Sequence, residues 1–353
     1  MNNLQVASQT DANVSFSGVP AHMSKKIKNI QKAGRSIGRS LRDQIRQSIK
    51  DHEIGRLMRE YPEWVEVGVA SATRAAPRAC ALLLGIAEGA GISFQEAFCM
   101  WYEELTFADT VDARLLKDTG CTDIVIRTAA GTIIGHTNDE GEGAGSRLFK
   151  IGIKGLPSLF MVFTRGGPSI GLNSAGIVIS GNQIDAADTR PGVPRMVLYV
   201  EACWSQTIEE AEKILLHEDR ASSFNNIIAD ASGEVVSLEA SARKSVKLTH
   251  PMGAAAHSNH FIFLPGVEAR EGSSLAGSRA RLERAIEEIK TAGGQIGVTQ
   301  ILQMMRTHGL GGLCRHGDNE SHTVFSTVFL PTERAFIYAA GNPCRAQFKL
   351  YRY

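Results

Sequence analysis

Hydrophobic residues in the first third of the chain recur at the spacing of a helix. Between Arg35 and Ile49 they occupy every fourth position and so share one helical face. The next apolar segment, PRACALLLGIAEGAG, is hydrophobic almost all round, and we expect a buried helix there. SFQE at Ser93–Glu96 is a capping box, which predicts the start of another helix. The first 120 residues are therefore predicted to be mostly helical.

Beyond residue 120 the spacing changes to that of short strands. TDIVIRT and GTIIGHT flank a turn of small residues at Ala129–Gly131, and GLNSAG is predicted to be another turn. Helices are predicted at TIEEAEKILLH, with Thr207 as its cap, and at Ser278–Lys290 and Thr299–Arg306. Further strand patterns are SLFMVFTR, GIVISGN, FNNIIADASGEVVSLEAS, SVKLTH, GAAAHSNHFIF and HTVFSTVFLPTERAFIYAAG. Strands interrupted by helices predict an α+β domain with layered sheets.

The patterns divide the chain into three segments. Residues 1–33 are polar and without periodicity, and are predicted to be a flexible N-terminal arm. Residues 34–120 form an α-rich segment, and residues 121–353 contain the sheets. We expect the second and third segments to pack together as one domain.

Composition narrows the class of protein. The chain is 43% hydrophobic and 21% charged, as in soluble globular proteins, and its net charge of +1 favours neither nucleic acid nor an anionic membrane as a partner. No secretory signal and no apolar run of about 18 residues is found, so a cytoplasmic location is expected.

Metal and disulfide signals are weak in the sequence. The six cysteines are scattered and form no CxxC pair, and most are expected to be core thiols. The histidine pairs His257/His260 and His316/His322 lack the partner residues of a metal motif. Neither a metal nor an organic cofactor is therefore expected.

One cysteine stands at the start of a predicted hairpin, directly after a glycine. The Gly120 carbonyl is unshielded by a side chain, and the Cys121 thiolate can attack it through a five-membered ring. Hydrolysis of the resulting thioester would cut the chain and leave Cys121 with a free α-amine, whose pKa in peptides is about 7.7–8.0. Such an amine can accept the thiol proton near neutral pH without help from a histidine. The cysteine of a Gly-Cys pair is more often a buried core thiol than a self-processing nucleophile, so the choice between the two depends on the surrounding motifs.

The motifs GCTD and GHTNDE, at the start and the end of this hairpin, resemble those of an autoproteolytic acyltransferase family. Its best-known member makes penicillins from isopenicillin N and acyl-coenzyme A, and bile salt and penicillin V hydrolases are more distant relatives. GLNSAGIVISGNQI, NNIIADASGEVVSLEAS, HSNHF and GNPC extend the resemblance over roughly residues 34 to 350. The resemblance implies an N-terminal nucleophile hydrolase, a four-layer αββα sandwich.

The resemblance also implies site residues. Cys121 matches the family nucleophile, and Asp139, 18 residues later, matches a family acid, although the adjacent Glu140 is an alternative. Asn259 in HSNHF matches an asparagine that helps to hold the oxyanion and the nucleophile's amine, and Asn182 matches an oxyanion-hole asparagine of the hydrolase branch. Arg279 lies near a family arginine, and Arg281 is an equally good match.

The implied enzyme would cut itself into two segments that stay associated as a heterodimer. It would transfer an acyl group from an amide or thioester, acyl-coenzyme A being a candidate donor, to an amine or to water. Thr137, Asn138 and Glu140 replace the aromatic-containing segment of the relatives, which leaves the substrate pocket undefined. A linear-amide hydrolase, an unprocessed transferase and a non-catalytic sandwich that binds small amides remain alternatives.

Overall fold

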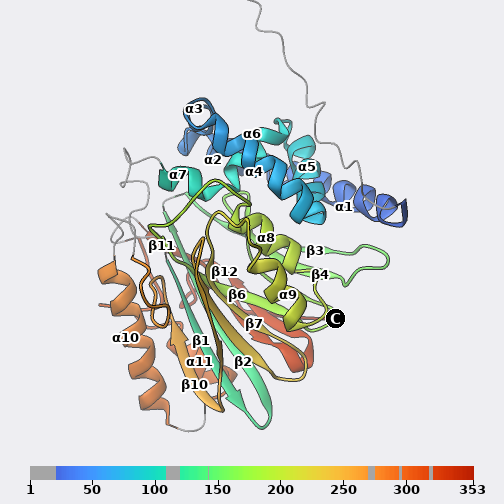
Figure 1. Ribbon diagram of the computed structural model, residues 1–353. Coiled ribbons are helices and arrows are strands. Elements are labelled where there is room, and N and C mark those ends of the chain that lie inside the picture. Colours follow the sequence, from blue (N-terminus) through green and yellow to red (C-terminus); the bar gives the residue numbers. More distant parts are fainter. Residues whose placement is uncertain (1–20, 109–119, 142, 269–274, 294–295, 318–320) are drawn as a thin grey trace, which may run out of the picture.

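Two antiparallel β-sheets lie face to face, with helices on their outer sides (Figure 1). This computed structural model describes residues 21–108, 120–141, 143–268, 275–293, 296–317 and 321–353. One apolar cluster fills the space between the sheets, and two others join each sheet to its own helical layer. The architecture is the predicted four-layer αββα sandwich with an α-rich N-terminal segment.

The six-stranded sheet has the order β10-β1-β2-β11-β12-β13, and α10 (Leu275–Ala292) and α11 (Val298–Met304) cover its outer face. Its strands are β1 (Gly120–Thr128), β2 (Gly131–Gly141), β10 (Gly253–His257), β11 (Ser321–Leu330), β12 (Ala335–Ala340) and β13 (Lys349–Arg352). The 3₁₀ turn η1 (Pro331–Glu333) joins β11 to β12 within the strand pattern HTVFSTVFLPTERAFIYAAG.

The seven-stranded sheet runs in chain order from β3 to β9, and α8 (Arg195–Ala202) and α9 (Ile208–Leu215) lie on its outer face. Its strands are β3 (Ser146–Ile151), β4 (Leu159–Thr164), β5 (Gly167–Asn173), β6 (Val178–Gln183), β7 (Phe224–Ala229), β8 (Val235–Ala240) and β9 (Ser245–Thr249). GLNSAG, predicted as a turn, is half strand: β5 extends to Asn173, whose Oδ1 accepts from the N–H groups of Ala175 and Ile177 to close the turn.

The N-terminal helices form the layer above α8 and α9 (Figure 1). They are α1 (Ala21–Ser40), α2 (Arg42–Asp51), α3 (Ile54–Glu60), α4 (Pro62–Ala75), α5 (Pro77–Ala90), α6 (Phe94–Met100) and α7 (Glu103–Ala108). The flexible arm predicted over residues 1–33 is wrong from residue 21 on, because α1 already begins at Ala21 and buries Ile27 and Ile30. Residues 1–20 lie outside the described part of the chain.

Two pairs of glycines, spaced four apart, let α1 and α5 touch backbone to backbone. A Cβ atom added at Gly34 of α1 would lie 2.2 Å from the Leu82 carbonyl oxygen, and one added at Gly85 of α5 would lie 2.0 Å from that of Gln31. Such distances are far below a van der Waals contact. Small residues at this spacing allow close helix pairing. The segment GRSIGRS, residues 34–40 of α1, therefore serves to pack α1 against α5.

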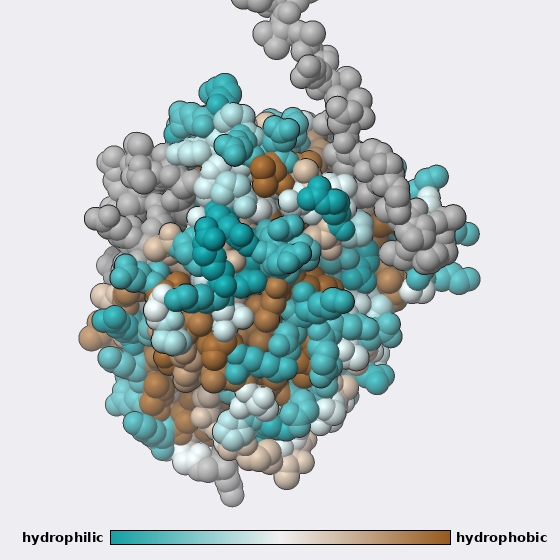
Figure 2. All heavy atoms as spheres, viewed as in Figure 1, coloured by the Kyte–Doolittle hydropathy of each residue, from teal (hydrophilic) through white to brown (hydrophobic). Residues whose placement is uncertain are grey.

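The predicted caps form. Ser93 and Glu96 make both hydrogen bonds of the capping box, and the Thr207 hydroxyl accepts from the Glu210 N–H. In Figure 2, hydrophilic residues predominate over the helical upper part of the face shown, and hydrophobic residues reach the surface lower down. Within the described residues, no helix is both long and apolar enough to cross a membrane.

Candidate active site

The hairpin of β1 and β2 fixes which side chains surround Cys121. Its two-residue turn at Ala129–Ala130 pairs Thr128 with Gly131, and the register continues to Cys121 opposite Asn138. Alternate residues of a strand share one face. Cys121, Asp123, His136 and Asn138 therefore lie together on the face toward the other sheet, where Ser180 of β6 meets them.

The Cys121 side chain is buried and held from two directions. Its Sγ accepts a hydrogen bond from Asn138 Nδ2 at 3.2 Å. Its backbone N–H donates to Asn259 Oδ1 at 2.8 Å, and its carbonyl accepts from the Ser258 hydroxyl at 3.2 Å. The two predicted residues Cys121 and Asn259 are thus in direct contact, through the nitrogen that would become the α-amine.

A histidine that the sequence reasoning overlooked lies beside the cysteine. His136 Nδ1 is 3.1 Å from Asp123 Oδ1, which also accepts from the Ser180 hydroxyl at 2.6 Å. Burial disfavours the charged imidazolium, but the Asp123 carboxylate and then the Cys121 sulfur raise the pKa of His136 to about 10. Nδ1 is held by Asp123, whereas Nε2 makes no hydrogen bond within the described residues and so stays available for proton transfer.

The glycine before the cysteine is packed against an arginine. A Cβ atom at Gly120 would lie 2.2 Å from Arg281 Nη2 and 2.9 Å from Asn259 Oδ1. Arg281 is buried and donates from Nη2 to Asn259 Oδ1 at 2.6 Å. Arg279, the residue carried into the predicted site, is exposed instead. Two positions on a helix are about 200° apart, so only one of the pair can face the sheet, and it is Arg281.

Asp139 lies next to Gly120 but on the opposite face of the sheet from the Cys121 sulfur. It pairs with Gly120 in the register and accepts from the Thr323 hydroxyl at 2.7 Å. Burial raises the pKa of this carboxyl, and the nearby Arg281 guanidinium opposes the rise. The Asp139 carboxylate is therefore placed to stabilise a positive charge on the backbone nitrogen of Cys121, whereas the Cys121 sulfur points to the other face of the sheet.

Glu140, the alternative to Asp139, faces a different environment. Its carboxylate pairs with Arg165 at 3.3 Å, on the turn between β4 and β5. Burial raises the pKa of Glu140 to about 7, although Arg165 lowers it. Of the two acids, Asp139 is therefore the one placed beside the Gly120–Cys121 bond.

Asn182 belongs to the same polar layer between the sheets. It is fully buried on β6, and its Oδ1 accepts from Asn225 Nδ2 at 3.1 Å and lies 2.9 Å from His257 Nδ1. Its Nδ2 group makes no hydrogen bond within the described residues. A buried amide that keeps a donor unused is suited to meet a developing oxyanion.

A buried carboxylate holds the loop that carries Ser258 and Asn259. Glu239 of β8 contacts His257 Nε2 at 2.7 Å and accepts from three consecutive backbone N–H groups at 2.7–2.8 Å, those of Ile262, Phe263 and Leu264. Burial opposes the charge, but these hydrogen bonds, first that of His257, lower the pKa of Glu239. The loop that follows β10 of one sheet is thereby attached to β8 of the other sheet.

The structure is thus an αββα sandwich in which Cys121 is the second residue of β1, a strand paired on both sides. A profile of the family described as acyl-coenzyme A:6-aminopenicillanic acid acyl-transferase matches residues 126–345. The chain belongs to this family. The match begins after Cys121, so the cysteine itself lies outside it.

Solved structures with a similar arrangement include those of two single-residue variants of conjugated bile acid hydrolase from Clostridium perfringens. Each is 12% identical to this chain and covers 66% of it and 97% of the hydrolase, with a TM-score of 0.40. No curated protein sequence matches the chain.

Proposed function

We propose that the chain is a precursor that cuts itself between Gly120 and Cys121 and then acts as an N-terminal cysteine acyltransferase or amide hydrolase. The supporting observation is that the Gly120–Cys121 peptide bond is surrounded by candidates for the proton donor, the group that holds the nitrogen and the positive charge that cleavage requires. His136 adjoins the Cys121 sulfur, Asn259 holds the Cys121 N–H, and the Arg281 guanidinium lies against the Gly120 Cα.

In the precursor the α-nitrogen of Cys121 is an amide and cannot serve as the base. A thiolate paired with the His136 imidazolium fills this need, as in other cysteine–histidine enzymes. The sulfur attacks the Gly120 carbonyl carbon, and the carbonyl π electrons move onto the oxygen. The Arg281 guanidinium, which lies against the Gly120 Cα, is the candidate positive charge to stabilise that oxygen. The C–N bond then breaks as the nitrogen takes the His136 proton, which leaves a thioester. Water hydrolyses it to a Gly120 carboxylate and a free Cys121 thiol and amine.

After cleavage the free α-amine of Cys121 becomes the base of the mature enzyme. Asn259 Oδ1, 2.8 Å from that nitrogen before cleavage, would hold the amine, and Asp139 would offset the charge of its protonated form. The sulfur attacks the substrate carbonyl, and the unused Asn182 amide is the candidate donor to the oxyanion. The acyl group then passes from sulfur to an amine or to water.

The two segments have buried contacts that would keep them together after cleavage. Arg78 of the first segment pairs with Glu201 of the second at 2.6 Å, and the Ala79 N–H donates to the same carboxylate. Glu104 accepts from the Arg195 N–H at 3.0 Å and from the Ser222 hydroxyl at 2.7 Å. These bonds cross the proposed cut, so we expect a heterodimer without a further linker.

Trapping of the acyl-enzyme tests the proposal. Intact mass spectrometry after mixing with a panel of acyl-coenzyme A thioesters and N-acyl amides should show one acyl adduct, mapped by peptide analysis to Cys121. The other five cysteines serve as internal controls, and Cys121→Ala should give no adduct. Release of the free acid indicates hydrolysis, and release of a new amide indicates transfer. An adduct absent across the panel, or found on another cysteine, contradicts the proposal.

A further inference from the structure

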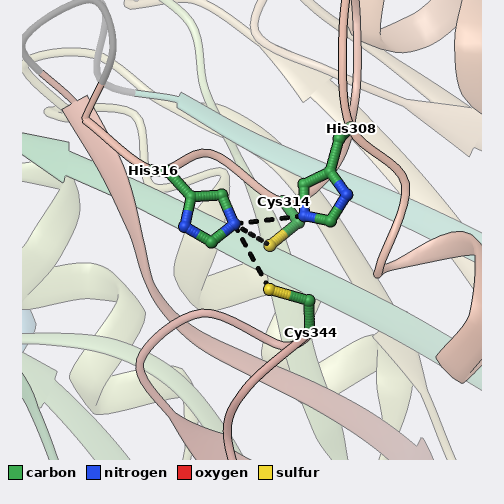
Figure 3. A group of neighbouring side chains, drawn as sticks. All are labelled: His308, Cys314, His316 and Cys344. Carbon is green, nitrogen blue, oxygen red and sulfur yellow. Dashed lines mark hydrogen bonds between the residues drawn. The ribbon is translucent and has the colours of Figure 1, made fainter.

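Two histidines and two cysteines converge beside the end of the six-stranded sheet where β11 begins and β12 ends (Figure 3). His308 follows α11, Cys314 and His316 lie in the segment leading to β11, and Cys344 follows β12. Their four ligand atoms all lie within 4.8 Å of one another. In the sequence, His316 lacks the partner residues of a usual metal motif, so no metal was expected there.

Hydrogen bonding alone does not account for this arrangement. His316 Nε2 lies 3.1 Å from His308 Nε2, 3.2 Å from Cys344 Sγ and 3.5 Å from Cys314 Sγ. One imidazole nitrogen is either a single donor or a single acceptor. Three groups that converge on it therefore cannot all be satisfied by it, and Figure 3 shows all three aimed at the same atom.

The three distances to His316 Nε2 are close to those of a tetrahedral zinc ion, and the other ligand atoms, all within 4.8 Å of one another, need move only slightly to bind it. With Zn–N of about 2.0–2.1 Å and Zn–S of about 2.3 Å, tetrahedral geometry places two nitrogens about 3.3 Å apart and a nitrogen and a sulfur about 3.6 Å apart. Two thiolates and two neutral imidazoles also balance the charge of a divalent ion. We infer that His308, Cys314, His316 and Cys344 form a structural Zn²⁺ site.

All four coordination positions are supplied by the chain, so the site has no open position for water or substrate, and its role is structural. The loops are shaped to bring the ligands together. Gly309, Gly311, Gly317 and Gly341 all adopt positive φ, which favours glycine, in the turns that carry the ligands.

The site adjoins the candidate active centre through Arg315, which lies between two of the ligands. The Arg315 N–H donates to the Thr323 hydroxyl at 2.9 Å, and that hydroxyl donates to Asp139 Oδ1 at 2.7 Å. A metal that fixes this segment would thus hold the hydrogen-bond partner of Asp139 in place. Zinc would support the active centre from outside without touching it.

Metal analysis of the purified full chain tests the inference. Protein prepared with zinc under reducing conditions should retain about one equivalent per chain after extensive dialysis. Cobalt substitution should give the intense visible absorption of tetrahedral Co²⁺ and a thiolate charge-transfer band, the latter reduced in Cys344→Ser and Cys314→Ser. His217→Ala, a histidine remote from the cluster in sequence and outside it, should bind metal like the wild type.

Two controls separate the outcomes. Cys121→Ala should bind zinc fully while it lacks acyl transfer, so failure of the proposed function does not affect this test. Wild-type protein that binds neither zinc nor cobalt, or that contains a Cys314–Cys344 disulfide under the same reducing conditions, overturns the inference. Because the wild-type measurement is decisive, the conclusion stands even where a ligand variant does not fold.

Discussion

The contact between Gly120 and Arg281 predicts that a single methyl group at residue 120 slows self-cleavage. In Gly120→Ala the new Cβ would lie 2.2 Å from Arg281 Nη2, 2.7 Å from Arg281 Cζ and 2.9 Å from Asn259 Oδ1. The guanidinium is the flexible end of a side chain, so it moves and the fold survives. Its 2.6 Å hydrogen bond to Asn259 is lost when it moves.

The size of the effect follows from that bond. A hydrogen bond to a charged group contributes about 1.5–3 kcal/mol. Each 1.36 kcal/mol added to the barrier slows a reaction tenfold, so cleavage should be about 10- to 100-fold slower. Displacement of the guanidinium also removes the positive charge that we propose stabilises the oxyanion at Gly120, which adds to the effect.

A time course of precursor loss on a denaturing gel measures the rate, and circular dichroism checks the fold. Gly145→Ala is a matched control, since its Cβ would meet no atom closer than Gln44 Nε2 at 3.7 Å. It should be processed at the wild-type rate. If folded Gly120→Ala protein is processed as fast as wild type, Arg281 has no part in the cleavage and the reasoning fails.

Three further predictions concern the charged residues of the site. His136→Gln should slow processing by about 10²–10⁴. Because the pKa of His136 is raised to about 10, the imidazolium that wild type keeps at neutral pH is lost as the pH rises through that value, so the rate should fall there and the variant should lack that limb. Asp139→Asn should slow processing and Glu140→Gln should not, as gels of the two will show; the reverse order would assign the role to Glu140. Glu239→Gln should lower the free energy of unfolding at pH 7 by about 1.5–3 kcal/mol. Because the pKa of Glu239 is lowered in the folded protein, its contribution to stability is present above the usual carboxyl pKa and is lost as the pH falls through the lowered value. Denaturant curves of wild type and variant should therefore converge in acid. Equal stability of the two at pH 7 would contradict this prediction.

Local signals in the sequence were sufficient for part of the site. The turn at Ala129–Ala130 sets the register of the hairpin, and Cys121 stands at its start as expected. The same register, followed along both strands, would have placed His136 opposite Asp123. The sequence reasoning stopped at the motif and missed that histidine.

Other features depend on tertiary packing. The choice between Arg279 and Arg281 rests on which side of α10 meets the sheet, and the charge pattern of the helix does not reveal it. Glu239 acts on backbone groups of a loop more than 20 residues away. The cluster joins His308, Cys314 and His316, which precede β11, to Cys344, which follows β12, so no spacing rule could detect it.

The helix before Ser40 was missed in part because its lysine-rich beginning looks like a solvated tail. Ile27 and Ile30 are buried there only because α5 lies beside them, at the short distance that the paired glycines allow.

Cleavage would make Cys121 a chain terminus, and the intact mass of freshly folded wild-type protein reports directly on this. We expect two polypeptides, residues 1–120 and 121–353, with Cys121 as the first residue of the second in N-terminal sequencing. Cys121→Ala should keep the mass of the uncut chain. A correctly folded wild-type protein that stays whole over days, and differs in mass from Cys121→Ala only by the substituted side chain, would contradict it.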